Sequence, residues 1–188
     1  MNEIEWVVLE DTTVTACVAA DPSHFLVLYD RYFSRVYTYM RYRSPDIYTA
    51  DDLTAQTFEQ ALAKIDSYDS QKAPFAAWLF AIARNLVNDN LRRGRRIKWL
   101  PLDGLERLPL RGDSPEKQAE LAEEQQHLLL ALKTLSSEQV DLLALKFAAE
   151  MTNREIARLS GMSEQNVGVI LHRSIKKLRK KLEEVSHE

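Results

Sequence analysis

The sequence of 188 residues is poor in residues that cross-link or interrupt a chain. Its single cysteine, Cys17, excludes an internal disulfide and leaves no cysteine pair to form a zinc site with His24, His127, His172 or His187. Only five glycines and six prolines occur, while 45% of the residues are hydrophobic and 28% are charged. These proportions predict a globular, helix-rich protein of a reducing compartment.

Signals for membranes and for catalysis are also lacking. No apolar run approaches the length of a bilayer, and the first twenty residues carry four acids without the basic segment that opens a secretory signal. There is no phosphate-cradling glycine motif, no metal-ligand spacing, and no Ser or Cys beside a candidate base. We therefore expect a cytoplasmic protein without membrane insertion, metal or cofactor, and not an enzyme.

The net charge of −3 hides a strong segregation of charge along the sequence. One basic stretch covers residues 84–98 and a second covers residues 172–181, whereas the acids lie mostly in the N-terminal tail and the middle. Clustered basic residues are typical of surfaces that bind nucleic acid, so a negative net charge does not exclude such a partner.

Helical periodicity predicts an all-α fold. Asp21-Pro22 marks the start of a helix that should end near Ser44-Pro45, and a second helix is expected from Thr49, with Asp52 completing a capping box. A third is expected from Pro74. The apolar residues expected to be buried on the second helix are Leu53, Phe58, Ala61, Leu62 and Ile65, and those on the third are Phe75, Trp78, Leu79, Ile82 and Leu86.

The periodicity stops between Leu100 and Asp113, where prolines and glycines recur. We expect a flexible linker there, between two small helical domains. The predicted division is an N-terminal tail over 1–20, a first domain over 21–98, the linker over 99–114 and a second domain over 115–188.

The segment from Thr152 to Lys177 reads as a helix-turn-helix. Ser136 and Gln139 form a capping box for the helix before this segment, and Thr152 and Glu155 form one at its start. Gly161 suits a left-handed residue at the turn, and Ser163 starts a longer helix. Gly168 within that helix suggests a close backbone approach to DNA or to a neighbouring helix. The alternative is an ordinary helical hairpin with a solvated basic end.

Three segments, in the expected order, resemble sigma factors of the sigma-70 superfamily. Residues Ala50–Phe58 resemble the polymerase-binding segment, Tyr68–Arg93 the helix that reads and opens the minus-10 promoter element, and Leu135–Leu178 the domain that reads the minus-35 element. The resemblance covers about residues 25–182, and the absence of other sigma regions indicates the extracytoplasmic-function (ECF) subgroup.

The resemblance implies three sites and three partners: core RNA polymerase, contacted at its clamp and flap, promoter DNA, and an anti-sigma factor. The residues implied at the clamp are Asp51, Asp52, Gln56 and Phe58. Those implied at the minus-10 element are Ser67, Tyr68, Asp69, Ser70, Gln71 and Lys72, which would hold a flipped base, and Arg84, Asn85, Asn88, Asp89, Arg92, Arg93 and Arg96. Those implied at the minus-35 element are Arg154, Ser163, Glu164, Gln165, Asn166, Gly168, His172, Arg173, Lys176 and Lys177.

Two aromatic residues, Phe58 and Trp78, can be interpreted in two ways. The sequence also departs from the family pattern at several positions. Phe58 is equally suited to a core, and Trp78 suits a core better than a stacking wedge. Ala55 and Gln56 stand where the family usually has Gln and an acid, which suggests an altered clamp contact. The recognition helix also departs from the family pattern, so its minus-35 sequence does not follow from typical members.

Two other functions compete with a sigma factor that binds polymerase and melts promoters. One is a stand-alone helix-turn-helix regulator whose N-terminal half senses or dimerises. The other is an interaction protein that keeps the sigma fold and is held by a partner over the apolar helix faces that flank the linker.

Overall fold

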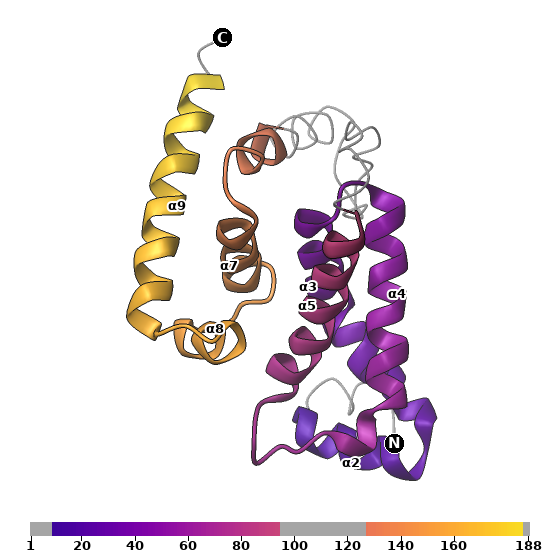
Figure 1. The fold of residues 1–188 in the computed structure, drawn as a ribbon. Coiled ribbons are helices and arrows are strands. Elements are labelled where there is room, and N and C mark those ends of the chain that lie inside the picture. Colours follow the sequence, from indigo (N-terminus) through magenta and orange to yellow (C-terminus); the bar gives the residue numbers. More distant parts are fainter. Residues whose placement is uncertain (1–8, 95–126, 186–188) are drawn as a thin grey trace.

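The computed structural model describes residues 9–94 and 127–185, and every regular element within these ranges is helical. Two groups of helices stand side by side in Figure 1. The first contains α2 (Asp11–Ala20), α3 (Phe25–Arg43), α4 (Ile47–Ala63) and α5 (Phe75–Gly94), and the second contains α7 (Ser137–Phe147), α8 (Asn153–Ser160) and α9 (Glu164–Val185). The all-α prediction is confirmed, while the predicted linker lies outside the described residues.

The first long helix begins and ends where the sequence predicts. The Asp21 carboxylate accepts a hydrogen bond from the Ser23 backbone N–H at 2.9 Å and caps a 3₁₀ turn, η1 (Pro22–His24), which leads into α3. The helix ends at Arg43, because Pro45 disfavours helical backbone in the residue before it and cannot donate a helical hydrogen bond.

The predicted start of the second helix is wrong by two residues. Helix α4 begins at Ile47, and its N-cap is Asp46, whose carboxylate accepts from the Thr49 backbone N–H at 2.8 Å and from the Thr49 hydroxyl at 2.9 Å. Thr49 therefore lies inside the first turn and forms no capping box with Asp52. An aspartate with extended backbone caps a helix as well as a threonine does. The sequence analysis did not consider Asp46 as a competing N-cap.

Helices α3, α4 and α5 enclose the core of the N-terminal domain. Leu28, Val36 and Met40 of α3 are buried against α4 and α5, together with Leu79 and Phe80 of α5. Phe75, Leu79 and Ile82 are buried as expected, and Trp78 and Leu86 are half-buried. The predicted burial of Leu62 is wrong, because this residue is 39% exposed near the end of α4.

Helix α2 is an element that the sequence patterns assigned to an N-terminal tail. Only Val14 and Val18 are buried on it, one turn apart, and β-branched residues such as Thr and Val are weak helix formers. Its stability therefore comes from packing against α3 and from the Asp11 carboxylate, which accepts from the Arg31 guanidinium at 2.5 Å and from the Tyr32 hydroxyl.

The C-terminal domain has the predicted helix signals. Capping boxes start α7 at Ser136 with Gln139 and α8 at Thr152 with Glu155. Gly161 ends α8 with a φ of 73°, in the left-handed region that favours glycine. Ile156 of α8 and Val167 of α9 are fully buried, so the two helices of the helix-turn-helix share a packed core.

One buried carboxylate, that of Asp141 on α7, joins the two domains. The Tyr39 hydroxyl donates to Asp141 Oδ1 at 2.8 Å, and Arg84 Nε donates to Oδ2 at 2.7 Å. Arg43 Nε lies 3.4 Å from Oδ1, and both the Arg43 and the Asp141 side chains are 4% exposed. We call Tyr39, Arg43, Arg84 and Asp141 the interdomain cluster. Burial and the nearby Asp141 charge raise the pKa of Tyr39 well above its usual value, so its hydroxyl keeps its proton and remains a donor.

Two arginines of the N-terminal domain, Arg84 and Arg35, cap helix ends across the domain boundary. Arg84 Nη1 donates to the Leu159 carbonyl at the end of α8 at 3.1 Å, and Arg35 Nη2 donates to the Ala149 carbonyl just after α7. The last carbonyls of a helix lack partners within that helix and carry partial negative charge. The N-terminal domain therefore supplies the cations that these C-terminal ends need.

Replacing Gly161 by alanine tests the turn of the helix-turn-helix. A Cβ at Gly161 would meet no atom within 4 Å, so the cost of Gly161→Ala is conformational and is expected to be about 1–2 kcal/mol in the free energy of unfolding. Gly168→Ala is the matched control: its Cβ would lie 3.7 Å from Asn153 Nδ2, an ordinary contact inside a helix, so stability should rise by up to about 1 kcal/mol. Urea denaturation measures both, and equal effects of the two substitutions would contradict the assigned turn.

Candidate polymerase and nucleic-acid interface

The outer face of α4 presents three of the four residues predicted to contact a polymerase. Asp51, Asp52 and Gln56 are all exposed, and Gln56 follows the two adjacent aspartates by about one helical turn. Asp51 lies close to Tyr37 of α3, and burial together with the Asp51 charge raises the pKa of that phenol. This acidic face is suited to a basic or hydrogen-bonding partner surface.

The fourth residue, Phe58, lies in the core. Its side chain is 4% exposed, and its ring lies 4.7 Å from that of Tyr29 and 6.4 Å from those of Phe25 and Phe33. The structure therefore gives Phe58 the core position that the sequence left open, from which it fixes α4 against α3 and so positions the acidic face.

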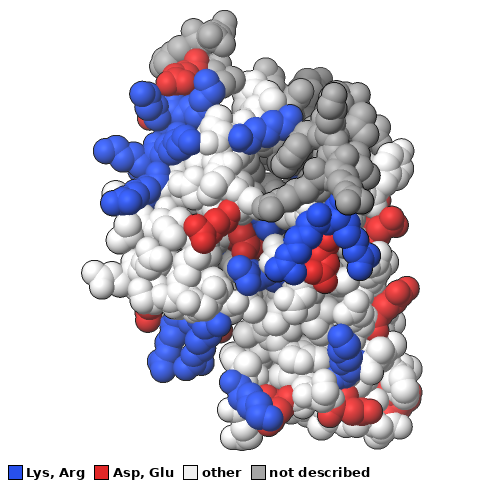
Figure 2. Space-filling model, viewed as in Figure 1, with Lys and Arg blue, Asp and Glu red and all other residues white. Residues whose placement is uncertain are grey.

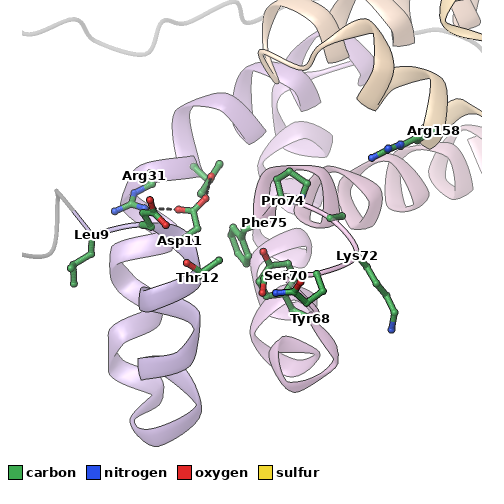
Figure 3. Close-up of a pocket in the computed structure, with 14 residues that line it drawn as sticks. Leu9, Asp11, Thr12, Arg31, Tyr68, Ser70, Lys72, Pro74, Phe75 and Arg158 are labelled. Atoms are coloured by element: carbon green, nitrogen blue, oxygen red, sulfur yellow. Dashed lines mark hydrogen bonds and ion pairs between the residues drawn. The ribbon is translucent and has the colours of Figure 1, made fainter.

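A pocket of about 750 Å³ lies at the loop before α5, within the range that holds small ligands. Four of the six loop residues predicted to hold a flipped base line it: Tyr68, Ser70, Gln71 and Lys72. Ser67 and Asp69 do not line it. Figure 3 shows Pro74 and Phe75 on the same side of the pocket as Tyr68 and Ser70.

The loop is held by its own polar contacts and by aromatic packing. The Asp69 carboxylate accepts from the Gln71 backbone N–H at 3.0 Å and pairs with Lys72 Nζ at 3.1 Å, and these two partners lower its pKa. The Tyr68 ring lies 5.4 Å from those of Phe75 and Trp78. Trp78 is thus half-buried at the loop, a position compatible both with core packing and with stacking on a base.

Residues from three other helices also line the pocket, and the sequence analysis missed them. Asp11 of α2 and Arg31 of α3 line its opposite wall, and Arg158 of α8 reaches it from the C-terminal domain (Figure 3). Asp11 was assigned to the tail, and Arg31 was not singled out. Arg158 comes to the pocket only through the packing of two domains, for which a single sequence holds no signal.

The polar face of α5 is divided between exposed residues and residues that contact the rest of the chain. Asn85, Asp89, Arg92 and Arg93 are exposed, and Arg92 pairs with Asp89 at 3.2 Å. Arg84 belongs to the interdomain cluster, and Asn88 Oδ1 accepts from Arg43 Nη2 at 3.1 Å. Arg96 lies outside the described residues.

The helix-turn-helix exposes the residues predicted for the minus-35 element. Of the ten, only Gly168 is not exposed, and the Ser163 hydroxyl caps α9 by accepting from the Asn166 backbone N–H at 3.2 Å. Gly168 shows no close approach to a neighbouring helix, so that explanation of the glycine is wrong. Lys and Arg side chains gather over the upper part of α9 in Figure 2, where Arg173, Lys176, Arg179 and Lys180 are exposed.

No group of three or more His, Cys, Asp or Glu side chains in the described part of the chain could hold a metal ion. Within residues 9–94 and 127–185, no helix is both long and apolar enough to cross a membrane.

Two family models match the chain in the order of its domains. Residues 28–97 match Sigma-70 region 2, and residues 125–178 match Sigma-70 region 4. Together these matches define the class: a sigma factor of the sigma-70 family, with the region 2 match over α3 to α5 and the region 4 match over α7 to most of α9.

Relatives narrow the class. The chain is 33% identical over 170 residues to the ECF RNA polymerase sigma factor BldN of Streptomyces coelicolor, covering 87% of this chain and 62% of BldN. It is 30% identical to ShbA of Streptomyces griseus, covering 69% of each protein, and 28% identical to SigM of Bacillus subtilis, covering 81% of this chain and 91% of SigM. The chain belongs to the extracytoplasmic-function sigma factors.

Solved structures support the fold. CnrH, solved in complex with the cytosolic domain of CnrY, aligns with a TM-score of 0.66 at 24% identity over 92% of this chain and 97% of CnrH. RpoE of Bartonella quintana, solved with the anti-sigma factor NepR, aligns with a TM-score of 0.67 at 23% identity over 85% of this chain and 96% of RpoE. At these identities the likeness concerns the fold.

Phe58→Ala separates a core role from a surface role. Removing a buried aromatic ring should lower the free energy of unfolding by roughly 3–5 kcal/mol, whereas Asp51→Ala on the exposed face of the same helix should change it by less than about 0.5 kcal/mol. Thermal denaturation followed by circular dichroism measures both. A Phe58→Ala protein as stable as wild type would contradict the core position.

Proposed function

We propose that this ECF sigma factor binds the clamp and flap of core RNA polymerase and directs the enzyme to promoters, where the N-terminal domain captures the minus-10 element and the helix-turn-helix reads the minus-35 element. The observation that carries the proposal is the pocket lined by Tyr68, Ser70, Gln71 and Lys72, placed directly before α5. A hollow with both polar and apolar lining at the start of α5 suits an unstacked base. Asn85, Arg92 and Arg93 are exposed farther along the same helix and suit the phosphates of the neighbouring strand.

Polymerase binding is assigned to the acidic face of α4. Asp51, Asp52 and Gln56 are exposed on a helix that Phe58 and its aromatic neighbours hold rigidly against α3. A preformed face loses little conformational freedom on binding. Gln56 replaces the acid that is usual in the family, so this contact relies on Asp51 and Asp52 for its charge.

Promoter melting needs no nucleotide hydrolysis in this proposal, and the chain acts as a non-enzymatic initiation factor. Open DNA is favoured because the chain binds single strands more tightly than duplex, through stacking, phosphate contacts and capture of a flipped base. Tyr68 and Trp78 are the half-buried aromatic rings nearest to the pocket and supply stacking surface.

The start of α9 is assigned to the major groove. Gln165 and Asn166 are exposed in its first turn and can pair with adenine edges, while Arg173 and Lys176 lie farther along the helix and can neutralise phosphates. Gly168 lies on the same helix, and its lack of a side chain leaves room for DNA next to the helix. Because polymerase acts in the cytoplasm, we place the chain there.

An anti-sigma factor is the third proposed partner. RpoE was solved with the anti-sigma factor NepR, and this chain shares its fold.

The proposal is tested by transcription in vitro with purified core polymerase on a pool of genomic promoter fragments. Wild-type protein should give specific initiation, and the triple substitution Asp51→Ala, Asp52→Ala, Gln56→Ala should reduce it at least tenfold because the clamp contact is lost. The matched control, Glu138→Ala with Glu183→Ala, removes two exposed acids from the C-terminal domain and should initiate like wild type.

Initiation that is unchanged in the triple variant would move the polymerase contact away from α4. If no protein supports initiation and all of them bind duplex fragments without polymerase, the chain is a stand-alone regulator and the proposal fails.

A further inference from the structure

One wall of the pocket before α5 comes from helices to which the proposed function gives no role in reading DNA. Asp11 and Thr12 of α2 line this wall together with Arg31 of α3. They lie across the pocket from Tyr68 and Ser70 of the loop (Figure 3). A base held against the loop presents its free edge to this wall.

The Asp11 carboxylate is held in one position on the wall. Its Oδ1 accepts from Arg31 Nη1 at 2.5 Å, and its Oδ2 accepts from the Tyr32 hydroxyl. Tyr32 is 4% exposed, and burial together with the hydrogen bond to Asp11 raises the pKa of its phenol, so the hydroxyl keeps its proton and remains a donor. Glu10, the other acid of the lining, is exposed and its side chain makes no capping hydrogen bond. Asp11 is therefore the acid that the structure positions.

The two donors leave acceptor sites on the Asp11 carboxylate. A carboxylate has about four lone-pair sites, and Arg31 and Tyr32 use one on each oxygen. The Asp11 side chain is 23% exposed, so the remaining sites are accessible. Its charge also acts across the pocket: burial raises the pKa of Tyr68, and the charges of Asp11 and Asp69 raise it further. The positive charge of Arg31 offsets that of Asp11 and reduces the repulsion of a nearby phosphate.

A group that only accepts hydrogen bonds distinguishes amino bases from keto bases. The Thr12 and Ser70 hydroxyls and the Gln71 amide of the lining can both donate and accept, so they suit either kind of base. A carboxylate accepts from the exocyclic amine of cytosine or adenine. The carbonyl oxygen that thymine or guanine has in the same place would face a second acceptor and be repelled.

We propose that Asp11 is a specificity-determining residue of the base pocket: held by Arg31 and Tyr32, it selects a flipped base that carries an exocyclic amine. This inference rests on the proposed function and adds the class of base that the pocket takes. It also gives α2 a part in promoter recognition, in a segment that the sequence analysis assigned to a tail.

The inference is tested with core polymerase and one promoter that the wild-type protein uses in vitro. Each position of its minus-10 element is randomised in turn, and barcodes in the transcripts count the templates used. Wild-type protein should favour cytosine or adenine over thymine or guanine by about tenfold at one position of the non-template strand. Asp11→Asn keeps an acceptor oxygen but adds an amide donor, so the preference at that position should fall below about twofold.

The matched control is Asp66→Asn in the 3₁₀ turn η2 (Ile65–Ser67), an exposed residue outside the pocket lining, which should keep the wild-type preference. Because the preference is a ratio among templates in one pool, it does not depend on how much of a variant is folded. A purely structural role of Asp11 would lower initiation on all templates alike and leave the ratio unchanged.

Tyr32→Phe provides a second test, because it keeps the buried ring and removes only the hydroxyl that holds Asp11. It should lower the preference severalfold even if Asp11→Asn fails to fold. If wild-type protein initiates but both variants keep its base preferences at every position, the inference alone is overturned. If wild-type protein does not initiate, the proposed function itself fails.

Discussion

The buried carboxylate of Asp141 is the interaction on which the relative placement of the two domains depends. Its oxygens receive a tyrosine hydroxyl and two guanidinium groups, all from the N-terminal domain. A polar contact of this kind is directional, so it fixes how the domains meet more narrowly than an apolar contact of equal area. Apolar packing accompanies this polar contact, because buried apolar residues of both domains form one continuous core.

The arginines of this interface link fold to function. Arg35 and Arg84 donate to carbonyls at the C-terminal ends of α7 and α8, where helices have unpaired acceptors, and Arg43 donates to the Ser137 carbonyl in the first turn of α7. Arg84 is also a residue that the family resemblance assigns to promoter DNA.

Much of the fold is predictable from local signals. The capping boxes at Ser136 and Thr152 and the left-handed glycine at 161 each depend on a few neighbouring residues, and each lies where the sequence indicates. The errors have tertiary or competing local causes. Helix α2 has only two buried valines and exists through packing on α3, and α4 starts at Ile47 because Asp46 caps it before Thr49 can.

The candidate sites also contain features that local sequence signals predict and features that depend on tertiary packing. Exposure of the acidic face of α4 and of the start of α9 follows from helical periodicity. The core position of Phe58 and the tertiary contacts of Arg84, Asn88 and Arg158 do not, because they depend on which helices meet. Periodicity identifies a polar face but not what covers it.

The account is tested most directly by the distance between the domains before and after polymerase binding. Spin labels are attached at two exposed positions, Asp30→Cys on α3 and Lys180→Cys on α9, in a Cys17→Ser background. Double electron–electron resonance then reports the distance between the labels. The account predicts one short distance in the free chain, where α7 packs against α3, and a distance longer by tens of ångströms in the complex with core polymerase and promoter DNA. The minus-10 and minus-35 elements lie about 25 base pairs apart, which is roughly 85 Å along B-DNA. The same distance in both states would contradict it.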